Sequence, residues 1–101
     1  MRRLTKVIKP RGWGIVYEEG TKKPITYAVI RILESQYNKV LETMVSDRKG
    51  RYSFLVGNNV FYLMSEKAGY KPVKTNLIDL TKVKEKEAIV KEDIGMEKGG
   101  V

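Results

Sequence analysis

The chain has 101 residues, a formal net charge of +8 at pH 7, and neither cysteine nor histidine. This length suffices for one domain with a modest core but not for two. Disulfides, thiolate metal sites and cysteine nucleophiles are excluded, and most zinc, triad and general-base schemes lose the histidine on which they depend. The composition therefore predicts no enzyme activity, no metal ion and no cofactor.

Positive charge is concentrated at the start of the chain. The first twelve residues contain no acidic side chain and carry five of the eight net positive charges, on Arg2, Arg3, Lys6, Lys9 and Arg11. From Trp13 onward, basic and acidic residues are close to balanced. We predict a basic leader or linker over residues 1–12, which can contact an anionic membrane surface. After this leader we predict a sandwich domain over residues 13–96 and a flexible tail over residues 97–101.

Past Gly12, short runs rich in Val, Ile, Tyr, Phe and Thr are separated by clusters of Gly, Pro, Asn or Asp. The clusters recur about every ten residues, which is typical of an all-β sandwich or barrel. No run shows helical periodicity sustained over several turns. We expect seven strands, near residues 14–17, 25–33, 40–46, 51–56, 60–66, 73–78 and 88–94.

The segments between the predicted strands have their own turn chemistry. Pro24 cannot donate a ladder hydrogen bond, so it should mark the start of the second strand. The Asp47 side chain can cap a tight turn, while Gly50 adopts the left-handed conformation that closes a hairpin. Gly57, which two asparagines follow, is expected to act in the same way before the fifth strand.

Five segments share their order with a known family: residues 14–17, 21–25, 28–32, 46–54 and 61–70. The fourth follows the hairpin pattern Thr-Asp-x-x-Gly-x-Tyr-x-Phe, with Ser46 in the place of Thr. The fifth is a strand followed by a corner formed by Gly69 and Tyr70. Together they resemble carboxypeptidase regulatory-like domains, a transthyretin-like or prealbumin-like sandwich family.

The resemblance implies a seven-stranded antiparallel β-sandwich with an immunoglobulin-like or transthyretin-like Greek key. It also implies a non-catalytic accessory domain of a larger cell-envelope or membrane-anchored protein. Since some relatives are classed with carbohydrate-binding folds, glycan binding is implied as an alternative. The chain has no signal-peptide core and no apolar run near the roughly 20 residues of a membrane helix, so we expect any export signal or anchor outside these residues.

Three conspicuous residues have structural interpretations. We interpret Asp47 as a turn former and not as a calcium ligand, because Arg48 and Lys49 occupy positions where further acids would be expected. Tyr70 should pack inward and bond its hydroxyl to nearby backbone. Trp13 either covers one end of the sandwich or is exposed as a stacking or membrane-interface residue.

Strand alternation predicts an apolar outer face in addition to the core. In an immunoglobulin-like arrangement, the first, second, fourth and fifth strands share one sheet. That sheet would gather seven outward side chains: Ile15, Tyr17, Tyr27, Val29, Leu55, Tyr62 and Met64. Such a face usually marks a protein contact. The alternatives are a register that is off by one residue and a face covered by terminal segments.

The sequence therefore predicts a structural and protein-interaction module that contacts other domains of a parent protein or a second copy of itself. The first alternative is a carbohydrate-binding module, with Tyr17, Tyr27 and Tyr62 as its platform. The second is a small basic nucleic-acid-binding domain, which the position of the charge in the leader disfavours. The adjacent Glu18 and Glu19 are expected to be solvated loop residues, since neighbours on an extended chain point to opposite sides.

Overall fold

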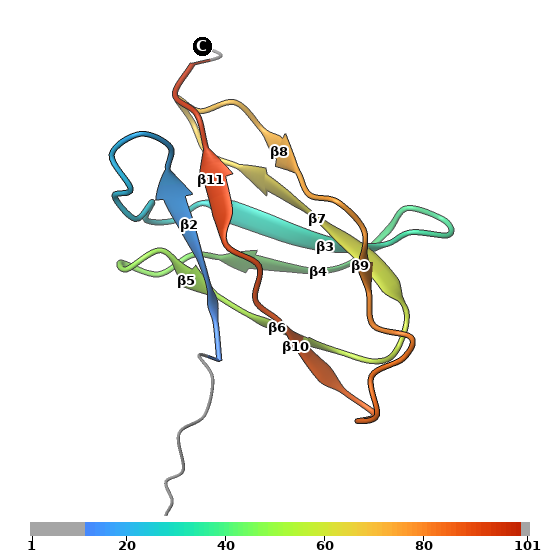
Figure 1. The fold of residues 1–101 in the computed structure, drawn as a ribbon. Helices are drawn as coiled ribbons and strands as arrows, with labels where there is room; N and C mark the ends of the chain where they lie inside the picture. Colours follow the sequence, from blue (N-terminus) through green and yellow to red (C-terminus); the bar gives the residue numbers. More distant parts are fainter. Residues whose placement is uncertain (1–11, 100–101) are drawn as a thin grey trace, which may run out of the picture.

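The computed structural model describes residues 12–99, which form ten β-strands and no helix (Figure 1). In this part of the chain none of the sheets is closed, and the strands lie in two layers around one core. One layer is a five-stranded sheet. Its strands are β4 (Lys39–Val45), β3 (Val29–Glu34), β7 (Val60–Glu66) and β8 (Val73–Lys74), with β9 (Ile78–Asp79) also paired to β7.

The opposite layer is assembled from shorter strands. A three-stranded sheet has the order β11 (Ile94–Met96), β2 (Gly14–Glu18) and β5 (Arg51–Tyr52), and a two-stranded sheet joins β6 (Phe54–Val56) to β10 (Ala88–Val90). The ladder between β11 and β2 is parallel, with Ile94 opposite Val16. The prediction of a wholly antiparallel sandwich is therefore wrong at this ladder.

Ten strands replace the expected seven because three predicted runs are interrupted. Ser53 separates β5 from β6, residues 75–77 separate β8 from β9, and residues 91–93 separate β10 from β11. The second strand also begins later than expected, at Val29. Its predicted start is held instead by loop hydrogen bonds from Ile25 N–H to the Val16 carbonyl and from Tyr27 N–H to the Ser46 carbonyl.

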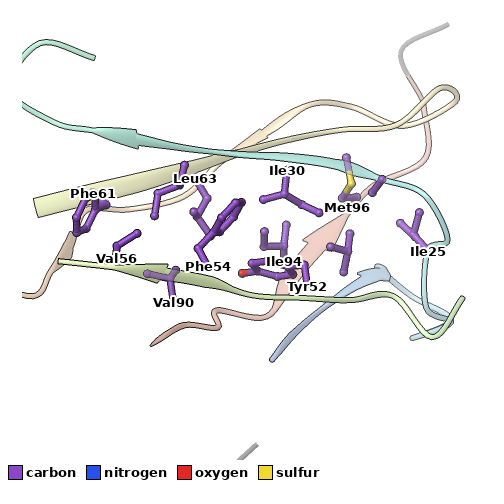
Figure 2. Packing of buried hydrophobic residues seen from close by; sticks show 13 residues of the cluster. Ile25, Ile30, Tyr52, Phe54, Val56, Phe61, Leu63, Val90, Ile94 and Met96 are labelled. Carbon is purple, nitrogen blue, oxygen red and sulfur yellow. The ribbon is translucent and has the colours of Figure 1, made fainter. Parts of the chain in front are cut away.

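The core fills the space between the two layers (Figure 2). Alternation decides which side chains enter it: Ile30 and Ile32 of β3 are fully buried, whereas Arg31 between them is not. Phe54 and Met96 enter from the opposite layer. Close packing of these apolar side chains is the main force that holds the layers together.

Side-chain hydrogen bonds stabilise the crossing from β10 to β11, formed by residues 91–93. The buried Tyr52 hydroxyl donates a hydrogen bond to the Glu92 carbonyl, and burial raises the pKa of this hydroxyl. The Ile15 N–H donates to Oδ1 of Asp93 at 3.0 Å. The crossing chain lies so close to Gly14 that a Cβ there would be 2.3 Å from the Glu92 carbonyl oxygen. Only glycine therefore fits at the start of β2 without displacing backbone.

One carboxylate organises the hairpin between β3 and β4. Glu34 is buried and accepts hydrogen bonds from the backbone N–H groups of Gln36, Tyr37 and Lys39. These bonds, the one from Tyr37 first, lower the pKa of Glu34. The loop therefore has a fixed conformation, with Asn38 in the left-handed region at a φ of 57°.

The described end of the chain belongs to the fold. Lys71 N–H donates to the Glu97 carbonyl at 2.9 Å, and Gly99 N–H donates to the Gly69 carbonyl at 3.0 Å. Backbone hydrogen bonds therefore join residues 97–99, which belong to the predicted tail, to residues 69–71. Residues 100 and 101 lie outside the described part, as do the five basic leader residues.

Candidate interaction surface

The seven residues of the predicted docking face do not share a face. Ile15 and Tyr17 lie on β2 and Leu55 lies on β6, which belong to one layer. The other predicted residues belong to β3, β7 or the loop before β3: Tyr27, Val29, Tyr62 and Met64. The prediction is wrong because alternation identifies outward side chains but not the sheet to which each strand belongs.

Tyr62 is unavailable for docking. Its side chain faces away from the main core, yet only 5% of the residue is exposed. The hydroxyl donates a hydrogen bond to Oδ1 of Asn38 at 2.8 Å, and Nζ of Lys74 lies 4.7 Å from the ring centroid. Tyr62 therefore packs under the β3–β4 loop and a lysine, and the predicted platform of Tyr17, Tyr27 and Tyr62 does not form.

The Asp47 turn has the expected chemistry. Oδ1 of Asp47 accepts hydrogen bonds from the N–H groups of Lys49 at 2.9 Å and Arg51 at 2.8 Å, and Oδ2 accepts from Nε of Arg51 at 2.7 Å. The bond from the Arg51 N–H contributes most to a lowered pKa of Asp47. Gly50 has a φ of 75°, the left-handed conformation that was predicted for it. The prediction that this turn closes a hairpin is wrong, because β4 pairs with β3 whereas β5 pairs with β2 in the opposite layer.

The remaining predicted turn residues also lie in connections between strands. Pro24 pairs with Tyr17 in an isolated bridge instead of opening a strand. The prediction for Gly57 is wrong: its φ is not positive, and β6 and β7 on either side of it do not pair with each other. The side-chain amide of the following Asn58 holds this connection by donating to the Leu80 carbonyl at 2.9 Å. Gly69 has a φ of 87°.

The Tyr70 corner differs from the prediction in one respect. Tyr70 packs against the core as expected, but its hydroxyl donates to Oε1 of Glu18 at 2.7 Å and not to nearby backbone. Thr21 also donates to this carboxylate, at 2.8 Å, and only 13% of the Glu18 side chain is exposed. The hydrogen bond from Tyr70, followed by that from Thr21, lowers the pKa of Glu18. Glu18 is therefore an anchor between distant segments and not a solvated loop residue.

The free long edge of β4 is the most exposed strand surface in the described part of the chain. Val40, Leu41 and Val45 are between 46% and 52% exposed. β4 pairs with β3 on one side, and no described strand pairs with its other side. A bulge interrupts the ladder at Leu41, whereas residues 42–45 follow β3 in unbroken register. This second half of β4 presents unpaired backbone groups together with apolar side chains.

A hollow of about 440 Å³ adjoins this end of β4. We call it the Trp13 hollow; its lining includes Trp13, Met44, Val45 and Tyr52. Trp13 is 37% exposed, and the Arg51 guanidinium lies 5.0 Å from its ring centroid. Trp13 thus lies at the surface with one ring face partly covered by Arg51. It neither covers the end of the sandwich completely nor is fully exposed, the two roles predicted for it.

Tyr27 is an exposed aromatic residue held in an unusual conformation. It is 62% exposed, and its φ of 60° lies in the left-handed region, which costs a non-glycine residue about 1–3 kcal/mol. Buried Ser46 stabilises this loop: its Oγ accepts from Ala28 N–H at 2.8 Å and donates to the Ile25 carbonyl at 2.7 Å. Thr26 adds a hydrogen bond to the Arg48 carbonyl. The Tyr27 ring is therefore displayed from a firmly bonded backbone.

Two hollows flank Tyr27. The Tyr27 hollow, of about 680 Å³, is lined by Tyr27, Asp47, Arg48, Lys49 and Arg51. On the other side, a hollow of about 480 Å³ is lined by Tyr27, Val29, Glu66, Lys67, Ala68, Tyr70 and Pro72. Because Arg51 also lines the Trp13 hollow, the Trp13 and Tyr27 hollows adjoin.

Sequence reasoning missed two parts of this surface. The apolar pair Val40 and Leu41 was a usable signal, because consecutive apolar residues on a strand place apolar groups on both sides of it. Arg48 and Lys49 were considered only as evidence against calcium binding. Their position beside Tyr27 arises from the hydrogen bonds of Ser46 and Thr26, and no local pattern encodes that contact.

Within residues 12–99, no three acidic side chains are grouped as metal ligands, and no helix is long and apolar enough to cross a membrane. A scan of protein-family models finds none that matches the chain, and a search of curated proteins finds no matching sequence.

Proposed function

We propose that this chain is a non-catalytic interaction module, an accessory domain of a larger cell-envelope or membrane-anchored protein. In this proposal the free edge of β4 accepts an extended segment from a second copy or from an adjoining domain of the parent protein. One observation carries the proposal: β4 is a seven-residue strand that is exposed at six of its seven positions, and no described strand pairs with one of its two sides.

Strand addition suits the chemistry of this edge. An added segment would satisfy the free backbone groups of β4 by hydrogen bonding and would cover Val45. Because the bulge at Leu41 breaks the regular ladder, we expect the segment to pair along residues 42–45. A bulky apolar side chain of the partner can then enter the adjacent Trp13 hollow, while Lys39 and Glu42 favour one orientation of the partner's charges.

At the level of the fold, we propose a seven-stranded Greek-key sandwich related to carboxypeptidase regulatory-like domains. Joining β5 with β6, β8 with β9 and β10 with β11 across their short interruptions supports the count of seven. The tight turn formed by Asp47 and Gly50 and the corner at Gly69 and Tyr70 support the relationship.

Sedimentation velocity of the intact chain, over a wide concentration range and at physiological and high salt, tests the proposal. We expect association that survives high salt and is lost in Val45→Lys, because lysine places charge on the paired edge. Leu55→Lys is the matched control, since Leu55 is 58% exposed on the opposite layer. Association that Val45→Lys leaves intact would contradict docking at β4. A monomer at every concentration would exclude the second copy as the partner.

A further inference from the structure

The Tyr27 hollow combines a preorganised aromatic ring with unbalanced positive charge. The Tyr27 backbone conformation is unfavourable for tyrosine, yet hydrogen bonds from both sides of the loop maintain it. A strained residue of this kind persists only where the surrounding structure holds it in place, and such residues concentrate at binding sites. The result is an aromatic ring at the surface whose backbone loses little conformational freedom when a ligand stacks on the ring.

The cations of the hollow outnumber its acids. Arg48, Lys49 and Arg51 line it with one acid, Asp47, whose two oxygens already accept from backbone and guanidinium groups. Neither Arg48 nor Lys49 forms an ion pair with another described residue. Arg51 donates to Asp47 through Nε, and its two terminal nitrogens are further donors of the guanidinium fork. The site thus offers three donors of positive charge beside one flat ring.

We propose that the Tyr27 hollow binds a small organic anion that carries a ring. The carboxylate or phosphate of the ligand faces Arg48, Lys49 and Arg51, and its ring stacks on Tyr27. Guanidinium groups suit planar or bidentate oxyanions, and a tyrosine face accepts either a nucleobase or the apolar face of a sugar. The proposal does not depend on a partner at β4.

The neighbouring charges favour a small ligand over a long polyanion. A chain of phosphates or sulfates that continued past Tyr27 would enter the next hollow, whose charged lining residues are one acid, Glu66, and one lysine, Lys67, so the excess of positive charge does not continue there. The described lining of the Tyr27 hollow contains one aromatic residue, Tyr27 itself. Nonspecific binding of single-stranded nucleic acid uses several stacked aromatic residues along a basic groove.

Binding can be measured by calorimetry and by the fluorescence of Trp13, the single tryptophan of the chain. Trp13 reports on the site because Arg51, which lines the Tyr27 hollow, stacks on its ring. The probes are glucuronate and uridine monophosphate, with glucose, uridine and inorganic phosphate as references. We expect at least one ring-bearing anion to bind about tenfold more tightly than its uncharged parent and than phosphate. The better of the two identifies a sugar acid or a nucleotide as the ligand.

Three variants separate the site from the fold. Tyr27→Asn removes the ring while tolerating the left-handed backbone, so it should retain the melting temperature and lose about tenfold in affinity. Arg48→Gln and Lys49→Gln should each weaken binding and reduce its dependence on salt. Lys86→Gln, on an exposed loop outside the hollow, is the charge-matched control. The proposal is overturned if neither anion exceeds its references, or if Tyr27→Asn binds as well as the unmodified chain.

Discussion

The two layers of this molecule hold their strands in different ways. In the five-stranded sheet, β3 pairs over all six of its residues with both β4 and β7. In the opposite layer, no ladder of the described strands exceeds three residue pairs, and side chains supply the remaining ties. The Tyr52 hydroxyl fastens the Glu92 carbonyl, and Asp93 fastens the Ile15 N–H. Long ladders thus fix the register of one layer, and individual side chains fix that of the other.

This difference predicts where the molecule is sensitive to substitution. Removing one contact from a six-pair ladder leaves the others in place, whereas the opposite layer depends on a few groups. The two layers are coupled through the core. The free energy of unfolding should therefore respond most to core side chains of the layer with the short ladders, which we call the weaker layer. The following substitutions test this contrast.

Phe54→Ala should have the largest effect. Phe54 is almost completely buried at the centre of the core, so truncation should lower the free energy of unfolding by about 3–5 kcal/mol. Leu55→Ala, one residue along the same strand but exposed, should change it by less than about 0.5 kcal/mol. Urea denaturation measures both. Equal losses would mean that β6 does not alternate between core and solvent.

Tyr62→Lys tests the outer face of the five-stranded sheet. Because Tyr62 is buried beneath Asn38 and Lys74, a lysine there loses apolar packing and faces another cation. We expect a loss of about 2–4 kcal/mol in thermal or urea unfolding. Tyr62→Phe, which removes only the hydrogen bond to Asn38, should cost about 1 kcal/mol. A Tyr62→Lys variant as stable as the unmodified chain would show that this ring is exposed in solution.

Tyr52→Phe addresses a single tie of the weaker layer. It removes the donor to the Glu92 carbonyl and keeps the buried ring, so we expect a loss of about 1–2 kcal/mol. Hydrogen exchange should also quicken in β11, which follows that crossing. The control is Tyr17→Phe, on the partly exposed outer side of the same layer. An unchanged exchange rate in β11 would mean that other contacts position the crossing.

Asp47→Asn should have the smallest effect, and that effect should depend on pH. The folded-state pKa of Asp47 lies below its ordinary value of 3.8, because the Arg51 N–H, the Arg51 guanidinium and the Lys49 N–H stabilise the carboxylate. The stabilisation is fully present above the ordinary pKa and is lost as pH falls through the lowered folded value. Melting temperatures from pH 7 to 2 should show a small deficit of the variant that disappears on acidification. A deficit that stays constant with pH would assign the effect to packing.

The sequence allowed the strands and turns to be predicted because their signals are local. Asp47 and Gly50 form the expected tight turn, although β4 and β5 do not pair as a hairpin. The seven predicted runs coincide with the strands apart from interruptions and a later start at Val29. The partition into sheets could not be predicted, because alternation places Ile15 and Val29 outward without stating that they lie on opposite layers.

The candidate surface was less predictable for the same reason. Tyr27 has a side chain that favours strands, yet hydrogen bonds with Ser46, far along the chain, hold it in a left-handed turn. The hydroxyl of Tyr70 bonds to Glu18 across a separation of 52 residues. Such contacts depend on the assembled fold, so the sequence placed Tyr27 on the outside but could not identify the residues that share its hollow.

The parallel pairing of β2 and β11 has a mechanical consequence. The described chain enters at the start of β2 and leaves beyond the end of β11, so its two ends emerge at opposite ends of the molecule (Figure 1). Tension between covalently attached neighbours would pull these adjacent strands in opposite directions along their length. Their hydrogen bonds would share the load in shear instead of opening one at a time. Under traction, the most resistant part of this domain would then be a ladder of only three residue pairs, reinforced by Ile94 and Met96 in the core.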